Sequence, residues 1–129
     1  MLTVRLLGQF SAEYRGVPLQ LRARKAQALL AWLCLAPGTP HRREQFAAAF
    51  WPDAEREAGL GYVRRMLWQI RGAFEAAAAN PDDYLLANDI DITFNPRASF
   101  WVDVQTLEQT ARRKRIVGGV VGCSHWHRI

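Results

Sequence analysis

The period of the hydrophobic positions changes along this chain, from alternation at its start to helical spacing further on. Leu2 to Gly8 and Phe10 to Tyr14 have the composition of strands, and Val17 to Leu21 alternates with period two after an Arg15-Gly16 turn. These three segments predict a small antiparallel meander.

Two helical segments follow the meander. Apolar residues recur at helical spacing from Arg24 until Pro37-Gly38 ends the run. A short extended connector at Thr39 to His41 leads to Arg42 to Trp51, where two phenylalanines stand four apart among alanines, which favour a helix. Pro52 ends this second helix.

An apolar stripe and an arginine-rich face share the third helical segment, Glu55 to Phe74. With Val63 at zero and about 100 degrees per residue, one apolar face lies within about 60 degrees of it. This face consists of Leu60, Met66, Leu67, Ile70 and Phe74. The opposite arc consists of Ala58, Gly61, Tyr62, Arg65, Trp68, Gln69 and Gly72, with Arg64 and Arg71 on its flank. We expect the helix to span about 54–75, with Asp53 as its cap.

A break at Asn80 to Asp83 ends the third helix, and residues 84–95 then have the pattern of a hairpin with an Asn88-Asp89 turn. The order of a strand meander, three helices and a terminal hairpin is the sequence signature of a winged helix-turn-helix, an α+β fold. In that fold the last helix enters the major groove of DNA.

Five ordered pieces also carry a family resemblance: VRLLGQF, RKAQALLAWLCLAPG, REQFAAAFWPDAE, YVRRMLWQIRGAF and FWVDVQTLEQ. They resemble the DNA-binding half of the antibiotic regulatory protein family, over residues 2–110. These bacterial transcriptional activators have an OmpR-like winged helix followed by an all-helical bacterial transcriptional activation domain. The resemblance implies that the third helix contacts duplex DNA and that the hairpin is a wing that reaches a minor groove or a phosphate.

The resemblance also implies partners and domains. An activator of this kind would contact RNA polymerase subunits, and a dimer would bind repeated half-sites as side-by-side copies. The predicted domains are a winged-helix DNA-binding domain at 1–97, the start of a truncated helical activation domain at 98–115, and a tail of unknown structure at 116–129. Phe100 to Gln109 is expected to begin the helical part.

Eight residues are candidates for DNA binding. Arginine presents a fork of two donors that matches O6 and N7 of guanine, and glutamine pairs with adenine, so Arg64, Arg65 and Gln69 suit base edges. Arg42, Arg43 and Arg71 suit phosphates. The set is Arg64, Arg65, Trp68, Gln69, Arg71, Tyr62, Arg42 and Arg43.

Other interpretations of this face remain open at the level of sequence. The arginines could simply face water, Trp68 could pack on the wing, and Arg71 could pair with Glu75. Trp51 is expected in the core. In a degenerate winged helix that binds protein, Tyr62 and Trp68 would be the anchors.

Length, composition and charge set the class of protein. A chain of 129 residues, 50% hydrophobic, suits one compact domain, and neither a secretory signal nor an apolar run of membrane-spanning length is present, so we expect a cytoplasmic protein. The net charge of +5 is the sum of +5 over residues 1–50, −5 over 51–111 and +5 over 112–129.

The residues indicate a protein that is not an enzyme and needs no cofactor. No phosphate-binding glycine loop, paired-carboxylate site or activated nucleophile can be placed. Cys123, His125 and His127 lack a fourth ligand, so no metal is expected. A disulfide framework is not expected from two cysteines in such different settings.

Overall fold

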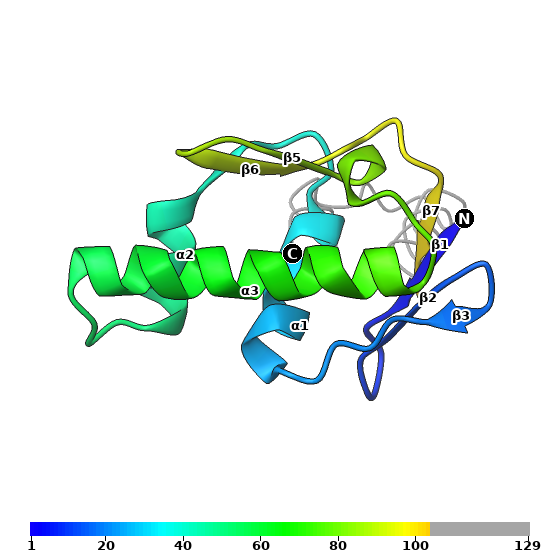
Figure 1. Ribbon diagram of the computed structural model, residues 1–129, viewed down its shortest axis with the longest axis horizontal. Helices are drawn as coiled ribbons and strands as arrows, with labels where there is room; N and C mark the ends of the chain where they lie inside the picture. Colours follow the sequence, from blue (N-terminus) through cyan, green and yellow to red (C-terminus); the bar gives the residue numbers. More distant parts are fainter. Residues whose placement is uncertain (104–129) are drawn as a thin grey trace, which may run out of the picture.

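The computed structural model describes residues 1–103, which form two small sheets and three α-helices (Figure 1). The first sheet has the strand order β3-β2-β1-β7. Its strands are β1 (Leu2–Arg5), β2 (Ser11–Tyr14), β3 (Val17–Pro18) and β7 (Phe100–Val102). The predicted meander is confirmed, and its turn has Arg15 at φ 51° and Gly16 at φ 82°, the left-handed values that a tight hairpin turn requires.

The helices confirm the three predicted segments. They are α1 (Arg24–Leu35), α2 (Arg43–Phe50) and α3 (Arg56–Ala76), with a short 3₁₀ helix η1 (Pro81–Asp83) after α3. Figure 1 shows α3 across the near side of the molecule, with α1 crossing behind it and the first sheet at its C-terminal end. No helix in residues 1–103 is long and apolar enough to cross a membrane.

The second sheet contains the wing and has the order β4-β6-β5. Its strands are β4 (His41–Arg42), β5 (Leu85–Ala87) and β6 (Asp91–Phe94). The Asn88 side chain closes the turn, because its Oδ1 accepts from the backbone N–H groups of Ile90 at 2.8 Å and Asp91 at 2.7 Å. The predicted hairpin is therefore confirmed.

The end of the predicted extended connector before α2 is part of a strand. His41 lies in β4, which pairs with β6 in antiparallel register so that His41 faces Ile92. Two residues carry no strand periodicity of their own, and β4 exists only because the edge of the hairpin supplies hydrogen-bond partners.

The core joins all three helices to both sheets. Its largest fully buried side chains are Phe46, Phe74, Phe94, Leu2, Leu29, Leu30, Leu33, Ile70, Leu85, Ile92, Val4 and Val63. The stripe predicted on α3 is confirmed, since Val63, Ile70 and Phe74 are almost fully buried, whereas Leu60 and Met66 at its margins are half-buried. Cys34 is buried in α1, and burial raises the pKa of its thiol.

The segment after the wing corrects a second expectation. Phe100–Val102 is not the first turn of a helix but strand β7, which pairs in parallel with β1. The Asp103 carboxylate then accepts from the backbone N–H groups of Leu6 at 2.9 Å and Leu7 at 3.2 Å, and so fixes the end of β7 to the residues after β1. Residues 104–129 lie outside the described part, and the predicted domain boundaries stay predictions.

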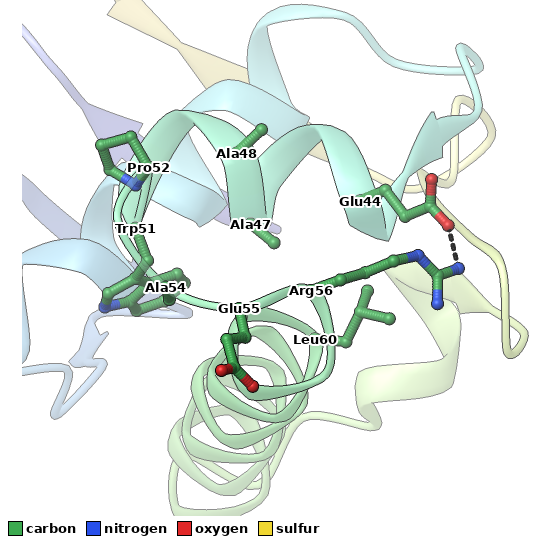
Figure 2. A pocket seen from close by; sticks show the side chains of 10 residues that line it. Glu44, Ala47, Ala48, Trp51, Pro52, Ala54, Glu55, Arg56 and Leu60 are labelled. Carbon is green, nitrogen blue, oxygen red and sulfur yellow. Dashed lines mark hydrogen bonds and ion pairs between the residues drawn. The ribbon is translucent and has the colours of Figure 1, made fainter.

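The start of α3 corrects a third expectation. The N-cap position is Glu55, and no side chain caps the helix, so Asp53 is not its cap. Asp53 lies in a turn in which the N–H of Ala54 donates to the Trp51 carbonyl at 3.1 Å, which places the aspartate before the helix begins. An ion pair between Arg56 and Glu44 instead joins the starts of the two helices (Figure 2).

The corner between α2 and α3 depends on a glycine. A Cβ added at Gly59 would lie 3.0 Å from the Cβ of Ala47, tighter than side-chain packing allows without movement. The pocket in Figure 2 opens beside this contact and is lined by Trp51, Pro52 and Leu60. Gly59 therefore permits the close approach of the two helices, whereas Gly61 has nothing within 4 Å of an added Cβ.

His41 provides a pH-dependent element of the second sheet. It is 7% exposed and lies against Trp32, at 6.3 Å between ring centroids, and Phe46, at 5.6 Å. Its Nε2 atom has no hydrogen-bond partner in residues 1–103. Burial lowers the pKa of this imidazole from its ordinary value of 6.5, because the charged form loses its hydration.

The free energy of unfolding is therefore expected to fall as the pH drops below 6.5. The unfolded chain takes up a proton at that pKa, whereas the folded chain does so only at lower pH, so protonation favours unfolding. Thermal melts at about pH 7.5 and about pH 5.5 should differ in the parent and differ less in His41→Phe. An equal difference in both proteins would exclude His41 as the source.

Candidate nucleic-acid interface

The outward face of α3 holds the predicted base-reading residues. Arg64 and Arg65 are exposed, Tyr62 is 36% exposed and Trp68 is 74% exposed. Gln69 is half-buried. The alternative in which Trp68 packs on the wing is wrong, because an exposed fraction of 74% leaves most of the indole in water.

Arg65 is positioned by an aromatic side chain on its own helix. Its guanidinium carbon lies 5.9 Å from the centroid of the Tyr62 ring, and that ring lies 5.2 Å from the ring of Trp51. A guanidinium over an aromatic face is attracted by the ring quadrupole, which restricts the rotamers of the arginine. Tyr62 therefore contacts Arg65 directly, and Trp51 supports Arg65 indirectly by packing against Tyr62.

A lysine on α1 also contacts Trp51. The Lys25 Nζ lies 4.7 Å from the Trp51 ring centroid and donates to the Phe50 carbonyl at 2.7 Å. Trp51 is partly buried and packs against the core, as expected. The cation, the two rings and Arg65 form a continuous row from α1 to the outward face of α3.

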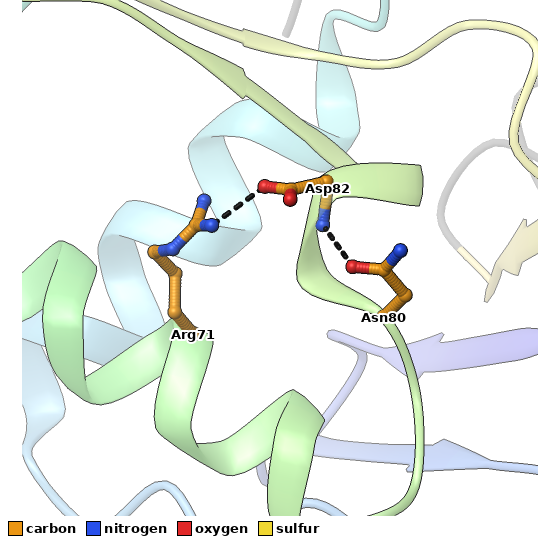
Figure 3. A network of polar contacts seen from close by, with 3 residues as sticks. All are labelled: Arg71, Asn80 and Asp82. Atoms are coloured by element: carbon orange, nitrogen blue, oxygen red, sulfur yellow. Dashed lines mark hydrogen bonds and ion pairs between the residues drawn. The ribbon is translucent and has the colours of Figure 1, made fainter.

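Arg71 lies on the opposite flank of α3 and already has an anionic partner. Its Nη2 atom is 2.6 Å from Oδ1 of Asp82 in η1, and the two side chains are 33% and 70% exposed (Figure 3). The Asn80 side chain accepts from the Asp82 N–H at 3.1 Å and orders this turn. The alternative pairing of Arg71 with Glu75 is not the one formed, because Ala78 at φ 64° reverses the chain and brings η1 beside the helix.

A second cationic cluster lies where α2 begins. The N–H of Arg43 donates to the Ile90 carbonyl of the wing at 2.9 Å, which substitutes for a side-chain cap on α2. Burial lowers the pKa of Arg43, and nearby Arg64 lowers it further, whereas Asp89 raises it. Arg43 is half-buried, and its Nε has no hydrogen-bond partner within residues 1–103. Arg64 of α3 thus shares this cluster with Arg43 and the wing.

The wing itself is acidic and partly apolar. From Leu85 to Asn95 it has no lysine or arginine, and it contains Asp89 and Asp91. Leu86 and Ile90 are 49% and 58% exposed. A phosphate contact from this hairpin would have to use N–H groups, because its carboxylates repel a polyanion.

The structure brings some candidates together and separates others. Tyr62 and Arg65 act as a unit on one flank of α3, and Arg64 joins Arg43 on the other. Arg42 is exposed on β4 opposite Asp91.

The sequence interpretation missed four residues that act on the candidate set. They are Lys25, Trp51 as a support, Asp82 and Asp89. Each lies far along the chain from the side chain that it affects, so no sequence spacing links the two. The sequence showed only that these residues are charged or aromatic.

A three-helix corner with a hairpin beside its last helix defines a winged helix-turn-helix, and the predicted fold class is confirmed. The fold is similar to that of Mycobacterium tuberculosis EmbR, solved in complex with a low-affinity phosphopeptide, with a TM-score of 0.69 and 20% sequence identity. The match covers 92% of this chain and 31% of the EmbR chain, so this chain spans less than a third of that length. No family model and no curated protein matches this chain.

Proposed function

We propose that this protein binds duplex DNA with sequence specificity through α3 and acts as a bacterial transcriptional regulator. The observation that carries the proposal is the outward face of α3, where Arg65 rests on Tyr62 and Arg64 stands exposed beside it. A winged helix presents this same helix to the major groove. The likeness to EmbR supports the fold on which the proposal depends.

The residues fall into two roles in this proposal. Arg64, Arg65 and Gln69 read base edges, since guanidinium and amide groups match the donors and acceptors of the major groove. Arg42, Arg43 and Arg71 lie nearer the ends and the flank of the helix, where the phosphates of the groove walls would run, and supply affinity that depends on salt.

A selection from random duplexes tests the proposal. The full chain should enrich a defined sequence, and its affinity should fall steeply between about 50 mM and about 200 mM salt. Binding without enrichment would contradict sequence specificity. Absence of DNA binding at the lower salt, together with salt-insensitive protein contact through Tyr62 and Trp68, would favour the protein-interaction alternative.

Asp82 is expected to restrain DNA binding by holding Arg71. In Asp82→Asn the guanidinium is released toward a phosphate, so affinity should rise and the log–log salt slope should steepen by about one. The free energy of unfolding should fall by no more than about 1 kcal/mol, because the ion pair is largely exposed. Affinity is measured by fluorescence anisotropy with the selected duplex.

The adjacent Asp83 is the matched control, because it is also exposed and has no ion pair within residues 1–103. Asp83→Asn removes the same charge and should leave the salt slope unchanged. Equal effects of the two substitutions would show that net charge, and not the release of Arg71, is responsible.

The proposal extends to an activator that contacts RNA polymerase subunits and binds repeated half-sites as a dimer. These features rest on the resemblance in sequence alone. Sedimentation of the full chain with duplexes that contain one or two selected half-sites tests the dimer directly.

A further inference from the structure

Four residues form one line along the side of α3 opposite its buried stripe, at spacings of four, three and four: Gly61, Arg65, Trp68 and Gly72. Residues at these spacings lie one above another on a helix. An added Cβ at either glycine would meet nothing within 4 Å, so no side chain fills the space directly above either end of the line. Only Arg65 and Trp68 project from its middle.

Trp68 is the most exposed large hydrophobic side chain among residues 1–103, at 74%. Within residues 1–103, no aromatic ring and no cation contacts the ring of Trp68. Trp51 and Tyr62, by contrast, have such contacts. Its indole carries one N–H donor and no acceptor, and the rest of its surface is apolar. An apolar group on a binding partner is therefore the best match for the exposed surface of this indole.

The major groove offers one apolar group, the C5-methyl of thymine. Arg65 precedes Trp68 by three residues, about 4.5 Å along the helix axis, which compares with about 3.4 Å per base pair. If Arg65 grips a guanine, the indole lies over a base pair one or two steps away. The bare glycines on either side leave room for the groove walls and let this pair reach the groove floor.

We infer that Trp68 is a specificity residue that packs on a thymine methyl one or two base pairs from the guanine read by Arg65. This inference rests on the proposed function and adds to it the identity of a second base. It also gives a role to the exposed indole, which neither the core nor the wing supplies.

The test replaces thymine by uracil, which removes the methyl and leaves base pairing intact. Duplexes selected from a random pool by the full chain are synthesised with uracil at each thymine in turn. At one thymine that lies one or two base pairs from a guanine, the parent should lose about fourfold in affinity, the contribution of one buried methyl-sized group. Trp68→Ala should bind both duplexes equally, at the weaker level or below.

Arg65→Ala serves as the control, because it should bind more weakly overall and still distinguish thymine from uracil. If the parent binds a selected duplex but tolerates uracil at every position, the thymine contact is refuted while the proposed function stands. Retention of the uracil effect in Trp68→Ala would assign the methyl to another residue and also refute it. Failure to enrich any sequence would instead refute the proposed function.

Discussion

Replacement of Arg65 by alanine is expected to weaken binding to the selected duplex by about five- to 150-fold, the equivalent of about 1–3 kcal/mol for a bidentate base contact. The effect should be large because Tyr62 already restricts the guanidinium, so little side-chain entropy remains to be lost on binding. Specificity should relax at one position of the site. Anisotropy titrations at fixed salt, with each base pair varied in turn, measure both effects.

Two further substitutions separate the guanidinium fork from its charge. Arg65→Lys keeps the charge but cannot make two parallel hydrogen bonds, so it should lose nearly as much affinity as alanine. Arg5→Gln removes an exposed cation on β1 of the first sheet and should have little effect. A lysine variant with parent-like affinity and specificity would show that Arg65 contributes charge alone.

Replacement of Gly59 by valine is expected to lower the free energy of unfolding by about 1–3 kcal/mol. The added side chain would collide with Ala47, already 3.0 Å from a single added Cβ, and would force α2 and α3 apart. Because both helices bury core residues such as Phe46 and Val63, the shift would reach the centre of the domain. Denaturant unfolding followed by tryptophan fluorescence measures the change.

Gly61 is the matched control, two residues further along the same helix. Gly61→Ala meets open space and should stabilise the helix by up to about 1 kcal/mol, because alanine loses less conformational entropy. Opposite signs at the two glycines would locate the packing constraint at Gly59. Similar effects at both would contradict the close helix contact.

Hydrophobic period was sufficient to predict the helices and the core face of α3. Val63, Ile70 and Phe74 recur at helical spacing, and a period of 3.6 places them on one side whatever the rest of the chain does. The hairpin of the wing could be predicted equally well, since its turn is closed by a local contact of the Asn88 side chain. The candidate site was predicted only as a set of residue types on one face.

Contacts between distant parts of the chain could not be predicted in this way. Strands β4 and β7 are two and three residues long, and each forms because a partner strand satisfies its backbone groups. The ion pair of Arg71 with Asp82 and the packing of Trp51 against Tyr62 likewise depend on how elements meet.

The sequence by itself therefore determined which segments are helical, which face of α3 is buried and which cations lie on the other face, because these follow from local periodicity. Tertiary structure alone decided which arginine is held by a carboxylate, that Trp51 packs against Tyr62, and that Trp68 is left in water. The physical reason is that pairing and exposure depend on distances between side chains that only the packed chain brings together.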